Sequence, residues 1–121
     1  MAGNTSSERH HWSLTASPVG DALRVQRSHG LDEFVLRVDG EADRATAAVL
    51  GQALASASHP EHERVVLDLT GLQLIDAHCL GVVSNAHCLL REQDRELVLR
   101  SPPPMVRRLL AICEMDALIE A

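Results

Sequence analysis

The sequence predicts a single α/β domain in which helices pack against a mixed central β-sheet of four to five strands. Its 121 residues are enough for one hydrophobic core but not for two. Short apolar runs typical of strands alternate with stretches of helical period, in the order β-β-α-β-α-β-α-β. This order favours parallel crossover connections, with helices that cover the sheet.

Residues 64–92 form the centre of the predicted fold. Residues 65–69 are an apolar run typical of a strand buried on both faces, and Thr70-Gly71 interrupts it. From Ala77 the apolar period becomes helical, and Asp76 is the predicted N-cap of that helix. The expected buried side of the helix consists of Cys79, Val82, Val83, Ala86, Leu89 and Leu90. An exposed helix start thus follows a buried strand, which is a common place for functional sites in α/β proteins.

The remaining elements lie on both sides of this centre. We expect residues 1–21 to form a flexible N-terminal arm and residues 22–121 to form the domain. Further strands are expected at 22–27, 34–38 and 96–100, with Leu118-Ile119 as a candidate for a short last strand. A helix capped by Asp43 is expected at 44–58. Another follows Pro102-Pro103-Pro104, with a buried stripe of Val106, Leu109, Leu110 and Cys113.

Composition excludes several classes of function. The net charge of -6 argues against a nucleic-acid binder, because neutralising phosphates requires a basic face. Trp12 and Phe34 are the only aromatic residues, so no platform exists for stacking bases. No apolar run is long enough to predict membrane insertion, and no export signal is evident. Three cysteines without such a signal predict reduced thiols in the cytoplasm.

Three segments carry a resemblance to a known family. Residues 34–43, FVLRVDGEAD, resemble a strand that ends in Gly-Glu-Leu-Asp, and residues 65–83 resemble a strand followed by an Asp-Ser-Ser-Gly-Leu-Gly helix start. Residues 101–119 resemble the last helix and strand of the same family. The chain is thus similar to STAS domains, in particular to bacterial anti-sigma factor antagonists. The resemblance implies a STAS-like fold and a protein that is not an enzyme, has no cofactor, and binds an anti-sigma factor, often a serine-kinase-like one. In that family, phosphorylation at the Asp-Ser-Ser-Gly turn switches the binding off.

The sequence departs from the family pattern at two places. It has Asp76-Ala77-His78-Cys79 where the family has Asp-Ser-Ser-Gly, so Ala77 and His78 occupy the usual serine positions and no phosphorylation is expected there. Glu114 stands where the family usually has glycine after the last helix. If Glu114 must adopt a positive φ, this costs about 1 kcal/mol.

The outer face of the helix after Asp76 is the candidate binding surface. It carries Ala77, His78, Gly81, Ser84, Asn85 and Cys88, and Asp43 and Asp76 are expected to flank it. From the residues alone, a solvated face with two helix caps is the simpler interpretation, whereas the resemblance favours a partner-binding face. An alternative partner is a larger signalling or transport complex, in which the chain is a scaffold or accessory subunit that needs no phosphorylation. A homodimer is a further alternative.

Redox chemistry at cysteine and metal binding are alternative roles for residues of this region. Cys79, Cys88 and Cys113 are candidate redox residues. A thiol near a helix N-terminus, as at Cys79, can have a lowered pKa, and Cys88 is expected to point outward and to be the most open to modification, although Cys79 and Cys113 are expected to pack in the core. The triplets Ala77-His78-Cys79 and Ala86-His87-Cys88 lie about 13 Å apart along a helix, which argues against a metal site. The sequence contains no recognisable catalytic motif.

Overall fold

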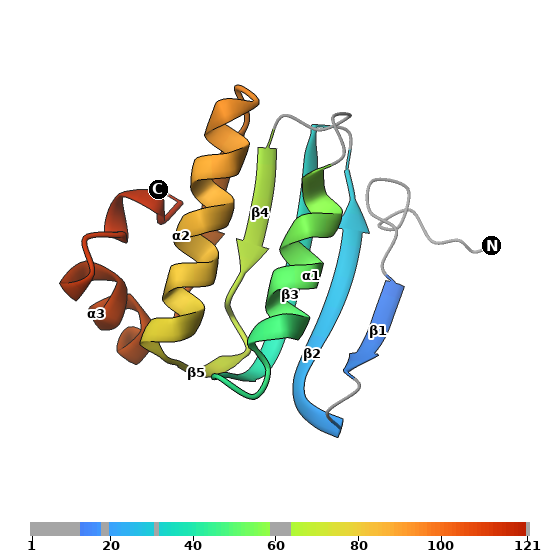
Figure 1. Ribbon diagram of the computed structural model, residues 1–121, viewed down its shortest axis with the longest axis vertical. Coiled ribbons are helices and arrows are strands. Elements are labelled where there is room, and N and C mark those ends of the chain that lie inside the picture. Colours follow the sequence, from blue (N-terminus) through green and yellow to red (C-terminus); the bar gives the residue numbers. More distant parts are fainter. Residues whose placement is uncertain (1–12, 18–19, 31, 59–63, 121) are drawn as a thin grey trace.

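The computed structural model describes residues 13–17, 20–30, 32–58 and 64–120 and confirms the predicted fold class. Figure 1 shows α1 (Ala47–Ala55) and α2 (Ala77–Glu92) side by side across one face of a mixed sheet, with α3 (Pro104–Ile112) beyond α2. The strands are β1 (Ser13–Ser17), β2 (Gly20–His29), β3 (Glu33–Ala42), β4 (Arg64–Asp68), β5 (Leu72–Ile75) and β6 (Glu96–Arg100). Two short 3-10 helices, η2 (Ser56–Ser58) and η3 (Asp116–Leu118), complete the described elements.

The sheet has six strands, in the order β1-β2-β3-β4-β6, and β5 pairs with β3 beyond the end of β4. The pairs β1–β2 and β2–β3 are antiparallel, whereas β3–β4, β3–β5 and β4–β6 are parallel. Two short strands, β1 and β5, therefore extend the four to five that the sequence predicts. β1 and the start of β2 lie within residues 1–21, the segment expected to be a flexible arm. Residues 1–12 are outside the described part of the chain, and the boundary between arm and domain stays a prediction.

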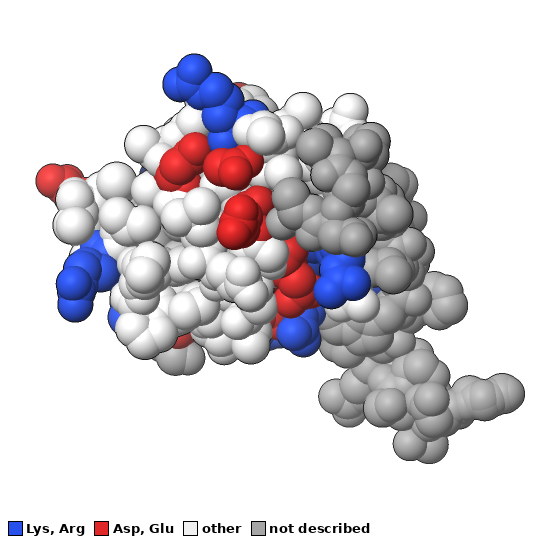
Figure 2. Space-filling model, turned by 90° about the horizontal axis from the view of Figure 1, so that it is seen from below, with Lys and Arg blue, Asp and Glu red and all other residues white. Residues whose placement is uncertain are grey.

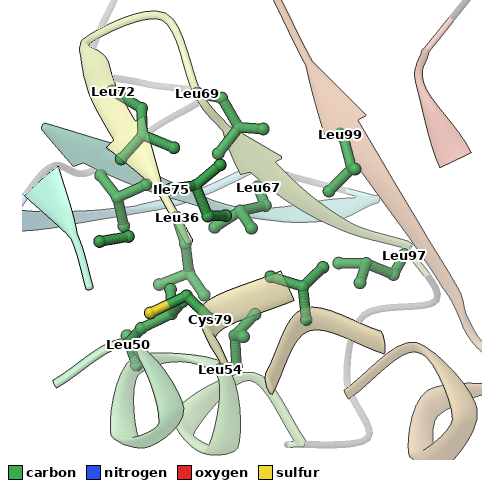
Figure 3. Close-up of a cluster of buried hydrophobic side chains, with 14 of the residues drawn as sticks. Leu36, Leu50, Leu54, Leu67, Leu69, Leu72, Ile75, Cys79, Leu97 and Leu99 are labelled. Atoms are coloured by element: carbon green, nitrogen blue, oxygen red, sulfur yellow. The ribbon is translucent and has the colours of Figure 1, made fainter. Parts of the chain in front are cut away.

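The main core lies between the sheet and the two helices. Alternate residues of the central strands point toward the helices, as the two-residue period of a strand requires. Figure 3 shows this cluster, in which leucines of the sheet meet Leu50 and Leu54 of α1 and Cys79 of α2. Its fully buried strand residues include Leu36, Val38, Val65, Leu67, Leu97 and Leu99. The intervening residues Val35, Val66 and Val98 form a smaller buried cluster of their own.

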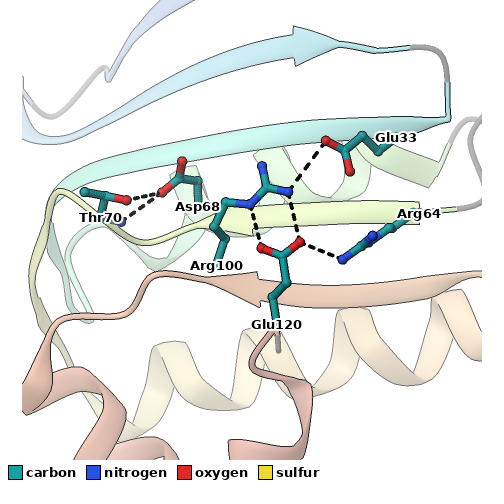
Figure 4. Close-up of polar contacts among 6 residues, drawn as sticks. All are labelled: Glu33, Arg64, Asp68, Thr70, Arg100 and Glu120. Atoms are coloured by element: carbon teal, nitrogen blue, oxygen red, sulfur yellow. Dashed lines mark hydrogen bonds and ion pairs between the residues drawn. The ribbon is translucent and has the colours of Figure 1, made fainter.

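A charged network ties the C-terminal segment to the sheet (Figure 4). Arg100 donates two hydrogen bonds to Glu120, from Nε to Oε1 at 2.7 Å and from an NH2 group to Oε2 at 3.0 Å. Arg64 donates to the same Oε2 at 2.7 Å. The hydrogen bond from Arg100, followed by the charges of Arg100 and Arg64, lowers the pKa of the Glu120 carboxyl despite its partial burial. The expected strand at Leu118-Ile119 is reduced to one parallel bridge from Ile119 to Leu99, because Leu118 belongs to the 3-10 helix η3.

The end of α3 corrects one predicted core residue. The helix ends at Ile112, so Cys113 is an exposed C-cap and does not extend the buried stripe of Val106 and Leu110. Glu114 adopts a φ of 59°, the left-handed conformation that the sequence placed at this position. The Glu114 amide donates to the Ala111 carbonyl at 3.0 Å, and the Met115 amide donates to the Leu110 carbonyl at 2.7 Å. This pair of bonds is a Schellman motif, which usually has glycine at the left-handed position.

We predict that Glu114→Gly stabilises the protein, because glycine adopts a positive φ without the steric penalty of a Cβ. The expected gain is about 1 kcal/mol, equivalent to a rise of about 4 °C in the melting temperature of a domain of this size. Glu114→Ala is the control, since it removes the charge but keeps the Cβ. An equal rise in both variants, measured by thermal unfolding, would contradict the explanation from φ.

We also predict that Glu120→Gln destabilises the protein at neutral pH, because glutamine cannot accept charge-assisted bonds from both arginines. Folding lowers the pKa of Glu120, so the ionised carboxylate stabilises the folded protein. This contribution to the free energy of unfolding is fully present above pH 4.5, the ordinary pKa, and is lost as the pH falls from there through the lowered pKa. The loss at pH 7 should be about 1 kcal/mol for this partly exposed pair. Urea unfolding at pH 7 and pH 3 measures it, and the difference between variant and wild type should shrink at pH 3. Glu92→Gln, at an exposed carboxylate, is the control.

Candidate partner-binding surface

The pairing of β5 with β3 brings two loops together at one end of the sheet. Ala42 is opposite Ile75 in this parallel pair, and the Asp76 amide donates to the Ala42 carbonyl at 3.0 Å. Asp43 and Asp76 therefore follow two neighbouring parallel strands and emerge at the same end. Figure 2 views the molecule from this end and shows acidic side chains gathered beside a broad uncharged area.

Asp76 is the N-cap of α2, as predicted. Its backbone is extended, with φ -104° and ψ 176°, and its Oδ1 accepts a hydrogen bond from the Cys79 amide at 2.9 Å. That hydrogen bond, aided by one from the Arg44 backbone, lowers the pKa of the Asp76 carboxyl. The helix start therefore presents a carboxylate at neutral pH, stabilised by the free amides of the first turn.

Asp43 caps a turn and not the helix itself, which corrects the sequence prediction. Its Oδ1 accepts from the Ala45 amide at 3.0 Å and from the Thr46 amide at 3.2 Å, and α1 begins only at Ala47. The N-cap of α1 is the buried Thr46, whose hydroxyl donates to the Glu41 carbonyl at 2.9 Å. These bonds fix residues 43–46 as a turn between β3 and α1. This turn lies beside Asp76.

Cys79 joins the two loops. Its side chain is fully buried, and its Sγ donates to the Asp43 carbonyl at 3.3 Å. Burial, reinforced by the charges of Asp76 and Asp43, raises the pKa of the thiol to about 12. The lowered pKa that its position near a helix N-terminus suggested is therefore wrong, because burial and two carboxylates outweigh the helix amides. Cys79 acts as a packed hydrogen-bond donor.

The outer face of α2 is exposed over its whole length. Its exposed residues are the six of the predicted surface, Ala77, His78, Gly81, Ser84, Asn85 and Cys88. A Cβ built on Gly81 would have no atom of the protein within 4 Å. Glycine at this position is thus not required by packing inside the domain, although it costs about 1 kcal/mol relative to alanine in a helix interior. Over residues 77–90 the face carries no Asp, Glu, Lys or Arg, and the exposed Arg91 and Glu92 follow in the last turn of α2.

The inner face of α2 differs from the predicted stripe. Cys79, Leu80, Val83 and Leu90 are buried, Val82 and Ala86 are partly buried, and Leu89 is 51% exposed. The adjacent pairs Val82-Val83 and Leu89-Leu90 fit two helix faces that are about 100° apart, so the pattern alone does not fix the rotation of the helix. Leu89 instead lies beside α1, a position that no local pattern could reveal.

A sequence model of the family described as "Mlab, STAS domain" matches residues 25–120. The chain belongs to the STAS domain family. The match includes β3, the β5–α2 junction and the C-terminal segment, which carry the likeness seen in the sequence. A comparison with curated protein sequences gave no match.

Solved structures of anti-sigma factor antagonists share the fold of this STAS domain. One from Mycobacterium paratuberculosis gives a TM-score of 0.73 at 20% identity, over 87% of this chain and 87% of that one. A putative antagonist from Thermotoga maritima gives 0.65 at 17% identity, over 94% of this chain and 87% of that one. The antagonist SpoIIAA in its unphosphorylated form gives 0.62 at 16% identity, over 90% and 85% of the two chains. At identities this low, the structural likeness shows a common fold and nothing more.

Within the described ranges, no group of three His, Cys, Asp or Glu side chains is placed to hold a metal ion. In the same part of this STAS domain, every helix is too short or too polar to cross a membrane.

The burial of the cysteines predicts their reactivity. Cys88 on α2 and Cys113 after α3 are exposed, whereas Cys79 is buried with a raised pKa. In the native protein, a thiol reagent such as dithionitrobenzoate should label Cys88 and Cys113 quickly, and Cys79 only after unfolding. Cys88→Ser and Cys113→Ser variants assign the two fast sites. Fast labelling of Cys79 in the native protein would contradict the proposed packing.

Proposed function

We propose that this STAS domain is a non-enzymatic binding module of the anti-sigma factor antagonist type. In this proposal, a serine-kinase-like anti-sigma factor docks on the start and outer face of α2, and its sigma factor is thereby released. One observation carries the proposal: an exposed, uncharged face of small side chains begins where the paired loops of Asp43 and Asp76 meet. Solved structures with the same fold include anti-sigma factor antagonists, which supports this class of partner.

The geometry of the face suits a partner helix. Small side chains at Ala77, Gly81, Ser84 and Cys88 follow one side of α2 and let another backbone approach closely. Asp43 and Asp76 lie at the end of this track, and the lowered pKa of Asp76 keeps a negative charge there for a basic residue of the partner.

We further propose that binding at this surface is independent of phosphorylation. Between Asp76 and Gly81 the chain has only Ala77, His78, Cys79 and Leu80, none of which has a hydroxyl. The exposed Ala77 and His78 occupy the positions of the family's serines. The partner therefore meets the same surface whether or not it can transfer phosphate.

The proposal predicts that Gly81→Arg abolishes partner binding without unfolding the protein, because a side chain at residue 81 extends into open space. The measurement is calorimetric titration against each purified kinase-like anti-sigma factor of the source organism. One of them should bind the wild type, and Gly81→Arg should weaken that binding at least about tenfold, or about 1.4 kcal/mol. The affinity should not change after prior incubation of the chain with that partner and ATP.

Ala111→Arg is the matched control, since it places the same bulk and charge on an exposed position of α3. Binding by Gly81→Arg at wild-type affinity would contradict the proposed surface. Loss of binding after incubation with ATP would contradict independence from phosphorylation.

A second candidate function is that of a subunit in a larger signalling or transport assembly. The absence of a hydroxyl at the helix start favours it, because such subunits do not need the phosphorylation switch. The proteins that copurify with the chain from its source cell distinguish the two functions: a kinase-like anti-sigma factor in the first case, a multisubunit assembly in the second.

Redox control is a further proposal, in which Cys88 responds to oxidation because it is exposed on the binding face. Cys113 is exposed on another part of the molecule, and Cys79 is shielded. An unchanged partner affinity after peroxide treatment would rule this control out.

A further inference from the structure

The two helices that cover the sheet form an outer layer that has no charged side chain before the last turn of α2, where Arg91 and Glu92 are exposed. Residues 47–58 and 77–90 contain no Asp, Glu, Lys or Arg, so all 11 basic and 17 acidic residues lie elsewhere. The exposed positions of this layer are Ala48, Gln52, Ala55, Ser56, Ala77, His78, Gly81, Ser84, Asn85, Cys88 and Leu89. Roughly a quarter to a third of the residues on a soluble protein's surface are normally charged. Depletion of charge is typical of the core of a protein–protein interface.

A hollow of about 330 Å³ lies between the two helices of this layer. The residues at its walls are mainly apolar or small, and include Gly51, Leu54 and Ala55 of α1 and Val82, Ala86 and Leu89 of α2. Leu89 lies at the edge of the hollow and is half exposed, so its side chain is available for contact with another molecule. The hollow can thus accept an apolar side chain from outside the domain.

Gly51 keeps this hollow open. A Cβ at residue 51 would meet only Val82 Cγ1, at an ordinary contact distance of 3.9 Å, so the domain itself has room for a larger residue. Gly71 is the opposite case, since a Cβ there would overlap the Asp39 carboxylate. Glycine in the middle of α1 costs about 1 kcal/mol relative to alanine. Its effect here is to leave space for an external group.

We infer that the part of this layer around the hollow pairs with a second copy of the same chain across a two-fold axis, with Leu89 of each copy seated in the hollow of the other. With a net charge of -6, two copies repel each other, and an uncharged face is where they can approach without like-charge contacts. The polar side chains that line the hollow are the amides of Gln93 and of Asn85, which lies at the border with the proposed partner face. Each amide is both donor and acceptor, so it can pair with its own copy in an isologous interface. Homodimer interfaces are also the more apolar class.

This pairing goes beyond the proposed function and does not rest on it. The hollow adjoins the C-terminal half of α2, whereas Asp76, Ala77 and His78 lie at the opposite end of the helix. Each copy of the dimer would keep its helix start open for a partner. The test uses the purified chain alone, so it can fail while partner binding succeeds, and the reverse.

The experiment is a concentration series of the full chain by sedimentation equilibrium. The wild type should be a dimer at tens of micromolar and dissociate on dilution. Leu89→Glu places two negative charges at the centre of the interface, one from each copy. It should raise the dissociation constant of the dimer at least about tenfold. Gly51→Leu fills the hollow from within, without a charge, and should weaken the dimer while the thermal stability of the monomer is kept or raised.

Ile112→Glu is the matched control, because Ile112, on α3, is the most exposed large apolar residue in the part of the chain that the structure describes, at 69%. It should remain a dimer like the wild type. A wild type that is monomeric throughout the series would overturn the inference. So would a dimer that Leu89→Glu and Gly51→Leu weaken no more than Ile112→Glu does, since the contact would then lie elsewhere.

Discussion

The hydrogen bond from the Asp76 amide to the Ala42 carbonyl is the constraint on which the functional surface depends. It exists because the chain leaves β4 at the Thr70-Gly71 turn and pairs β5 with β3. The pairing sets the start of α2 directly beside the loop after β3. Cys79 then strengthens the junction from inside, through its bond to the Asp43 carbonyl. Two carboxylates and the first turn of a helix are thereby fixed relative to one another, so a partner would meet an ordered surface at little entropic cost.

The distribution of charge divides the molecule into two parts with different physical roles. Charged side chains of the sheet and the C-terminal segment stabilise the monomer, as in the network of Arg64, Arg100 and Glu120. The helical layer is held mainly by its apolar inner side, together with hydrogen bonds such as those from Arg27 to Ser56 and from Cys79 to the Asp43 carbonyl. Its outer side consists of small and amide side chains, which contribute little to the stability of a monomer. Interactions with other proteins are the physical role that such a surface suits best.

Local signals in the sequence predict the fold well and the site only in part. Asp76 could be identified because an aspartate directly before a helical period is a strong cap signal. The start of α1 at Ala47, three residues later than expected, could not be predicted, because it depends on the hydrogen bond from the Thr46 hydroxyl to the Glu41 carbonyl, outside the helix. The exposure of Leu89 depends on how α1 packs against α2, and the exposure of Cys113 on where the left-handed Glu114 ends α3. The sequence thus predicts the six exposed residues of the partner-binding face, but the exposure of Leu89 and the hollow between the helices require the tertiary structure.

The central claim is that a partner docks at the β5–α2 junction and along the outer face of α2. Amide chemical-shift mapping of the isotope-labelled chain with its unlabelled, copurified partner tests it most directly. The account predicts that the largest changes occur at residues 43–46 and 76–85. Changes confined to α3, or to the face of the sheet that carries Val35 and Val66, would contradict it.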